Sequence, residues 1–229
     1  MKKIFTGCLC LLTTVSYGQF AIIQDTDGYV NIRSSAALTA NISDTLHNGR
    51  FVWYFDNDGE WVNVDYQKKG ISKNGYIHKS RIIYLTALDS IPLLKTEANK
   101  IIFSNDSLQV SLSFKKFNPA RHKLTYKRED GVSYISRINN KVIWGTDGNI
   151  PKAQYASVTI KKGNTSSQLP LSAIENLYEP NPEFHECHYD KKKDILYIST
   201  LNSDGAGSYA LLWVIEKGKY KERITVIPF

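Results

Sequence analysis

Three side chains near the C-terminus could bind a metal ion or attack a substrate. His185, Cys187 and His188 lie within four residues of one another. Imidazole and thiolate groups are zinc ligands, and a cysteine becomes a nucleophile when a histidine lies beside it. In a strand, side chains alternate between two faces, so His185 and Cys187 share one face and His188 points to the other. We therefore expect neither a metal site nor a cofactor from this segment alone.

Two loops offer carboxylate and amide oxygens, which are the ligands that calcium prefers. One loop contains Asp147 and Asn149, and the other contains Asn202 and Asp204. Only two of the four are carboxylates, and Asp-Gly pairs are also common in hairpin turns. We expect turns here, with Asp147 and Asp204 as the alternative metal-binding pair.

The N-terminal part holds a group of large aromatic side chains that could form a binding surface. Aromatic rings offer wide contact area to sugar rings and extended peptides, at little cost in conformational entropy. The candidate ligand-binding residues are Tyr29, Trp53, Tyr54, Trp61 and Tyr76. The alternative is that Trp61 and Tyr76 pack the interior of the domain.

Short alternating segments must position these residues. Residues 29–33 place Val30 and Ile32 on one face, with Tyr29, Asn31 and Arg33 on the other. Residues 61–66 also alternate, with Val62 and Val64 facing inward if Trp61 faces outward, although the reverse register fits the pattern too. Turn-forming residues separate the segments. This pattern predicts a small β-barrel built from close-spaced strands.

The chain is predicted to be mainly β throughout. The N-terminal strands are expected at residues 20–23, 29–33, 41–46, 51–55, 61–66, 75–78 and 82–83, with a turn at 70–74. The C-terminal strands are expected at 108–114, 123–127, 132–138, 141–144, 155–161, 184–189, 195–200, 209–216 and 223–227, with a short helix at 171–177. So many short strands favour an antiparallel β-sandwich or an open barrel after the small barrel.

The domain boundaries follow from changes in composition. Residues 1–18 have two lysines, an apolar run and small residues at their end, as a secretory signal peptide does. The domains are then expected at residues 19–85 and 99–229, with a linker at 86–98 that contains Pro92. The apolar run is too short for a permanent anchor, and no transmembrane segment is expected after cleavage.

Export restricts the partners and the cysteine chemistry. Signal removal takes away Cys8 and Cys10 and leaves Cys187 alone, so no internal disulfide is expected. The formal net charge of the whole chain is +7, which suits solubility, anionic wall polymers or membrane surfaces. We expect a periplasmic or extracellular protein, for which nucleic acid is not the natural partner.

A family resemblance rests on residues Asp27–Arg33, Val52-Trp53, Trp61–Val64, Gly75–His78 and Ser80–Ile82 together. They resemble a bacterial SH3-like domain (SH3b), a small β-barrel of secreted and envelope proteins whose members commonly bind peptidoglycan or its peptides. The family's Ser-Gly-Pro turn is absent, because Ser34-Ser35-Ala36 stands in its place. The resemblance covers about the first third of the mature chain.

Three functions compete at this point. The first is an exported, non-catalytic binding protein whose SH3b domain engages peptidoglycan or an envelope protein. The second is an envelope-acting hydrolase, which requires the two acidic loops, or Cys187 and a distant histidine, to meet in a cleft. The third is a structural adaptor whose first domain contacts only its own second domain, with Trp61 and Tyr76 buried between them.

Overall fold

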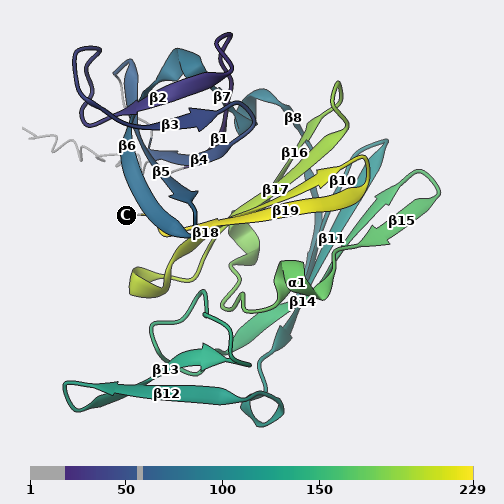
Figure 1. Cartoon of the computed structure of the whole chain (residues 1–229). Coiled ribbons are helices and arrows are strands. Elements are labelled where there is room, and N and C mark those ends of the chain that lie inside the picture. Colours follow the sequence, from purple (N-terminus) through teal and green to yellow (C-terminus); the bar gives the residue numbers. More distant parts are fainter. Residues whose placement is uncertain (1–18, 56–58, 229) are drawn as a thin grey trace, which may run out of the picture.

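The computed structural model describes residues 19–55 and 59–228, and the chain forms almost only strands (Figure 1). The signal peptide predicted for residues 1–18 lies outside the described residues. A curled sheet forms the first domain, and two further sheets and a projecting two-stranded arm form the second. The prediction of a mainly β chain is confirmed. No helix in the described part of the chain is long and apolar enough to cross a membrane.

The first domain is one seven-stranded sheet that curls around its own core. Its order is β3-β2-β6-β5-β4-β1-β7, and its pairings are antiparallel. The strands are β1 Gln19–Ile23, β2 Tyr29–Arg33, β3 Ile42–His47, β4 Phe51–Phe55, β5 Trp61–Lys68, β6 Ile71–His78 and β7 Ile82–Tyr84.

Alternation decides which side chains fill that core. Val30 and Ile32 of β2 and Val62 and Val64 of β5 are buried, as the period of two predicts. The turn predicted at 70–74 is shorter than expected. Lys69 and Gly70 both have positive φ, 54° and 76°, which closes a two-residue hairpin turn, so β6 already begins at Ile71.

A glycine contact joins the two halves of the motif on which the family resemblance rests. A Cβ atom at Gly75 would lie 2.4 Å from Cγ2 of Ile32 and 3.0 Å from the carbonyl oxygen of Arg33. Only glycine leaves room for β2 and β6 to approach this closely. The contact holds β2 against β6 at the point where Arg33 pairs with Tyr76.

The second domain is a sandwich of two five-stranded antiparallel sheets. One has the order β15-β14-β11-β10-β9 and the other β19-β18-β17-β16-β8. The strands are β8 Asp89–Ser90, β9 Leu93–Glu97, β10 Lys100–Ser104, β11 Leu108–Lys116, β14 Ala153–Lys162, β15 Thr165–Gln168, β16 Glu186–Asp190, β17 Ile195–Asn202, β18 Tyr209–Glu216 and β19 Lys219–Val226. Apolar side chains of both sheets form one core.

Several predicted elements differ from the structure. Residues 86–98, expected to be a linker, contribute β8 and β9 to the two sheets of the sandwich. The strand predicted at 141–144 is wrong, because Lys141 and Trp144 form only isolated bridges. The helix expected at 171–177 is limited to α1, Leu171–Ile174.

Strand β18 lies between two cores. Its residues from Tyr209 to Ile215 are all buried. Leu211 and Trp213 face the sandwich core, whereas Leu212 and Val214 pack against Phe20 and Trp53 of the first domain. The two domains are therefore joined by a continuous apolar cluster, and the molecule has three β layers.

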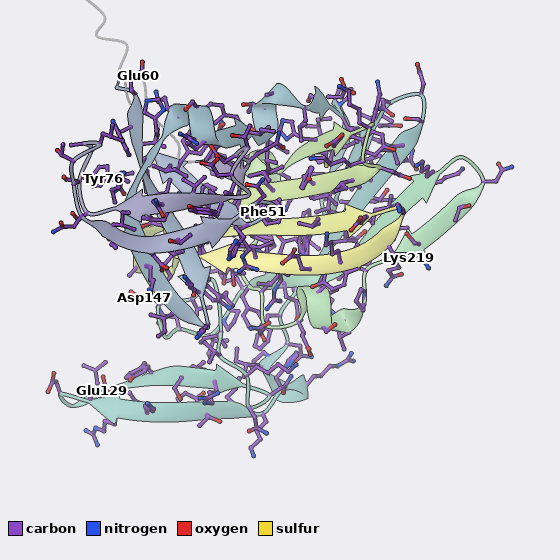
Figure 2. All side chains as sticks on the ribbon, turned by 45° about the horizontal axis from the view of Figure 1, so that its top comes forward. Phe51, Glu60, Tyr76, Glu129, Asp147 and Lys219 are labelled. Carbon is purple, nitrogen blue, oxygen red and sulfur yellow. The ribbon has the colours of Figure 1, made fainter. Side chains whose placement is uncertain are left out.

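The arm consists of β12 Leu124–Glu129 and β13 Val132–Ile138, paired only with each other as a separate two-stranded sheet. A small cluster that includes Phe117, Ile138 and Tyr178 anchors its base. Figure 2 shows Glu129 at the far end of the arm, away from both domains.

Candidate functional site

A groove of about 420 Å³ lies on the outer surface of the first domain. Strand β2 provides one wall, the loop after it contributes Leu38, and the beginning of β5 and the end of β6 provide the other wall. The lining residues are Asp27, Tyr29, Val30, Asn31, Arg33, Leu38, Trp61, His78, Ser80 and Arg81. Alternate residues of β2 face the core, so the side chains of Tyr29, Asn31 and Arg33 point outward and line the groove.

Arg33 and Trp61 form the centre of the groove. The guanidinium carbon of Arg33 lies 6.0 Å from the centre of the Trp61 ring, within cation–π range. Arg33 also donates from Nη1 to the carbonyl oxygen of Ala40 at 2.7 Å. This second contact holds the loop from residue 34 to 41 against the groove and fixes the orientation of the guanidinium plane.

His78 orients the indole from the other side. Its ring stands edge-on to Trp61, with ring centres 5.3 Å apart and an interplanar angle of 89°. The backbone N–H of Ser80 donates to Nδ1 of His78 at 3.3 Å, so Nδ1 acts as an acceptor. Nε2 faces Glu60 at 3.7 Å. The hydrogen bond at Nδ1 positions the histidine ring, and Trp61 packs against it.

An ion pair closes one end of the groove. Arg81 donates from Nη1 to Oδ2 of Asp25, whose other oxygen accepts from the backbone N–H of Asp27 at 2.9 Å. The backbone hydrogen bond from Asp27 and the contact with Arg81 lower the pKa of Asp25. The carboxylate therefore stays ionised, and Arg81 is tied to the turn before β2.

The groove suits an extended ligand with rings or carboxylates. It offers aromatic faces from Tyr29 and Trp61 and an apolar contact from Leu38. Arg81 is already paired with Asp25, so Arg33 is the groove cation that can bind a negative group on a ligand. Planar guanidinium groups bind carboxylates through two parallel hydrogen bonds.

The five aromatic residues predicted to form one binding surface do not lie together in the structure. Tyr29 and Trp61 line the groove, whereas Tyr76 lies half-buried on the same sheet outside it. Figure 2 labels Tyr76 on the first domain. Trp53 and Tyr54 are only 4% and 5% exposed. Trp53 packs in the cluster between the domains, so these two residues take no part in the groove.

Several groove residues were not proposed as ligand-binding from the sequence. These are Asp27, Val30, Asn31, Arg33, Leu38, His78, Ser80 and Arg81. The alternation in residues 29–33 already placed Asn31 and Arg33 on the same face as Tyr29, and this pattern was sufficient to predict them as ligand-binding residues. Leu38 and Arg81 come from loops, whose position depends on long-range packing, and no local pattern identifies them.

The two acidic loops meet at a second, smaller cavity. Asp147, Asp204 and Glu179 line a space of about 330 Å³ in the second domain, together with Lys152. Asn202 is fully buried instead, and its Nδ2 donates to the hydroxyl oxygen of Tyr155 at 2.9 Å. Within residues 19–55 and 59–228, no three His, Cys, Asp or Glu side chains are placed to hold a metal ion.

The His185–His188 segment does not form an exposed reactive centre. Cys187 lies in the sandwich core, and burial raises the pKa of its thiol well above the usual value. His185 is also buried, with Nε2 2.9 Å from the hydroxyl of Tyr155 and Nδ1 2.9 Å from the carbonyl oxygen of Asn181. Burial lowers the pKa of His185 to about 4. A neutral thiol without solvent access is a poor nucleophile.

Comparison with known proteins returns no relative. No family model matches the chain, and no match was found among curated proteins or solved structures.

Proposed function

We propose that this is an exported, non-catalytic binding protein whose first domain holds an extended ligand of the cell envelope in the Arg33–Trp61 groove. The ligand is peptidoglycan, through its peptides and sugars, or an envelope protein. The proposal rests on one observation above all: a guanidinium group held over an indole ring at the centre of a 420 Å³ groove.

Two further features support this assignment. Peptide stems of peptidoglycan carry carboxylates, which the guanidinium group of Arg33 can bind, and sugar rings stack on aromatic faces such as Trp61. The groove also lies on the sheet that contains the residues resembling an SH3b domain, Asp27–Arg33 and Gly75–His78. The predicted signal peptide would bring the chain to the compartment in which peptidoglycan is found.

Co-sedimentation with purified peptidoglycan tests the proposal. The chain from residue 19 onward is mixed with insoluble peptidoglycan, and the bound fraction is measured across salt concentrations. We expect wild type to pellet and Trp61→Ala to lose at least tenfold in affinity, because the aromatic face and the support of Arg33 both disappear.

Two matched variants control for folding. Ile71→Ala removes an exposed apolar side chain of the same sheet outside the groove, and Tyr76→Ala removes an aromatic ring that does not line it. Both are expected to pellet as wild type does. If wild type stays in the supernatant at every salt concentration, peptidoglycan is not the ligand. If Ile71→Ala and Tyr76→Ala are impaired as strongly as Trp61→Ala, the groove is not the site.

A structural adaptor is the second candidate, and the packing between the domains favours it. Phe20, Trp53 and Leu85 of the first domain share a cluster with Leu212 and Val214 of β18. Trp61 and Tyr76, which this alternative expected to be buried between the domains, lie outside that cluster. An adaptor without an envelope ligand would show no pelleting, yet would unfold in one cooperative step because the domains share a core.

A further inference from the structure

The arm formed by β12 and β13, together with the segments at its base, carries most of the chain's net positive charge. Residues 115–141 contain eight lysine and arginine residues and two acidic ones, a net charge of +6, against +7 for the whole chain. Lys2 and Lys3 of the predicted signal account for two more positive charges. From residue 19 onward, the rest of the chain is therefore close to neutral. Within the arm itself, the charges of Lys127, Arg128 and Arg137 are offset in part by those of Glu129 and Asp130, so most of the excess charge lies at its base.

Few of these cations are neutralised within the molecule. Among the described residues, Lys141 is the one member of the eight with an ion pair, to Glu175. Lys127 and Arg128 are exposed on β12, and Arg128 donates only to the carbonyl oxygen of Gly131, at 3.2 Å. The cations of the arm and its base are therefore free to attract a negatively charged partner.

The outer edge of β12 is open. Ile135 lies opposite Tyr126, and the N–H of Ile135 donates away from β12, to the carbonyl oxygen of Gly148 at 2.8 Å. In an antiparallel pair of this kind, both residues direct their backbone groups away from each other. Tyr126 therefore points its N–H and C=O to the free side, and Arg128, two residues on, does the same.

The backbone groups at the start of β12 also face the open side. The N–H of Ile138 donates to the carbonyl oxygen of Lys141 at 3.2 Å, and Ile138 lies opposite Leu124. Leu124 thus also faces the open side. In the described part of the chain, no segment pairs with this edge, whereas β13 is partly covered by the loop that contains Gly148.

We propose that the free edge of β12 binds an acidic, extended segment of a partner protein, which adds to the arm as a third strand. The outward backbone groups of Leu124, Tyr126 and Arg128 form the ladder, as in other complexes formed by strand addition. Lys127 and Arg128 pair with carboxylates of the incoming strand, and the ring of Tyr126, 55% exposed, covers one of its side chains.

The charge pattern selects this occupant over two others. A second copy of the arm would bring Lys127 and Arg128 beside like charges, and charged edges of this kind prevent self-pairing. A membrane would meet Glu129 and Asp130 first, because both lie at the tip between the strands. An acidic strand meets neither obstacle.

Binding of two synthetic peptides to the chain from residue 19 onward tests the proposal. One peptide alternates glutamate with valine or threonine over ten residues. The other has the same charge but prolines at alternate positions, which removes the N–H groups that a ladder needs. Affinity is measured by fluorescence anisotropy, and amide exchange of Tyr126 and Arg128 is followed by NMR. We expect at least tenfold tighter binding of the first peptide, with slowed exchange at both amides.

Substitutions at the edge distinguish a ladder from charge attraction. Tyr126→Pro removes one outward N–H without breaking a bond to β13, and Tyr126→Ala keeps it. We expect at least a tenfold loss of affinity for Tyr126→Pro and a smaller loss for Tyr126→Ala. Lys127→Glu combined with Arg128→Glu is expected to abolish binding of the acidic peptide.

Three results would overturn the proposal. Equal affinity for the two peptides would show that charge alone attracts acidic chains. Absence of binding at low salt would show that the arm does not bind an acidic strand. Protection of the Tyr126 and Arg128 amides in a dimer without peptide would show that a second copy occupies the edge. The exchange measurement uses wild type, so it decides the question even if Tyr126→Pro fails to fold.

Discussion

The guanidinium group of Arg33 lies over the indole ring of Trp61, 6.0 Å from its centre, although the two residues are on strands separated by β6. Nη1 of Arg33 donates to the carbonyl oxygen of Ala40 at the same time. The side chain of Arg33 thus links Trp61, in one wall of the groove, to the loop from residue 34 to 41. Its planar shape is as important as its charge.

Arg33→Lys is therefore expected to weaken the groove while keeping the charge. A lysine ammonium cannot stack on Trp61 and donate to Ala40 in the same geometry, and the lost cation–π contact corresponds to about 0.5–1 kcal/mol. Peptidoglycan retention should fall several-fold. Arg50→Lys, at an exposed arginine of the same domain that does not line the groove, is the control and should retain full binding. Equal retention by both variants would contradict this role of the guanidinium plane.

The two tryptophans of the first domain should differ sharply in their contribution to stability. Trp53 is buried against Phe20, with ring centres 4.9 Å apart, in the cluster between the domains. Trp53→Ala is expected to reduce the free energy of unfolding by about 3–5 kcal/mol. Trp61→Ala, at the groove surface, should cost about 1 kcal/mol or less. Urea unfolding of both variants measures the difference.

Trp53→Phe refines that prediction. Among the described residues, Nε1 of Trp53 is buried without a hydrogen-bond partner. Phenylalanine keeps the apolar packing and removes the unpaired donor, so it should restore most of the stability that alanine loses. A phenylalanine variant as unstable as the alanine variant would show that ring size, and not the unpaired N–H, dominates.

Asp65 is expected to make stability depend on pH. It is buried on β5, Oδ2 has no partner among the described residues, and burial raises its pKa to about 6. An unfolded aspartate has a pKa of about 3.9. Between about pH 4 and pH 6, the folded chain therefore holds a proton that the unfolded chain releases, and the contribution of Asp65 to stability falls as pH rises.

Asp65→Asn tests this by removing the ionisation. We expect the variant to exceed wild type in unfolding free energy by on the order of 1–3 kcal/mol at pH 7.5, with a much smaller difference at pH 4. Urea denaturation at several pH values measures both. A difference between variant and wild type that does not change with pH would contradict the prediction.

Gly75→Ala should destabilise the first domain through Ile32. The added methyl group would lie 2.4 Å from Cγ2 of Ile32, and forcing extra volume into a packed contact costs about 1–3 kcal/mol. Ile32→Ala removes the obstructing atom, so the double variant should lose less stability than the two single losses added together. Strict additivity in thermal or urea unfolding would show that the contact is not the cause.

Cys187 should be unreactive in the folded protein. Its thiol is buried and its pKa is raised by burial, so little thiolate is present at neutral pH. A thiol-specific reagent is expected to modify the chain from residue 19 onward only after denaturant is added. Rapid labelling under native conditions would revive the hydrolase alternative, in which Cys187 acts as a nucleophile.

The sequence alone predicted the strands of the first domain and the residues that share a face, whereas it did not predict β8, β9, β10 and β15 of the second domain. Alternation in residues 29–33 placed Val30 and Ile32 on one face, and alternation in residues 61–66 placed Val62 and Val64 on one face. All four are buried in the structure. A period of two is a local property of an extended chain, so it can be read without knowing the partner strand. The polar strand β15 escaped prediction because Thr165–Gln168 contains no apolar residue to reveal a period.

Only the tertiary structure decided what each outward face meets. Trp53 and Trp61 both stand on outward faces of the same curled sheet, yet Trp53 packs against β18 and Trp61 remains in the groove. The open edge of β12 could not be predicted from the sequence, and only the structure brings Asp147 and Asp204, which the sequence offered as an alternative pair, to one cavity. These outcomes depend on contacts between residues far apart in the chain, and burial of apolar area, not local propensity, selects among them.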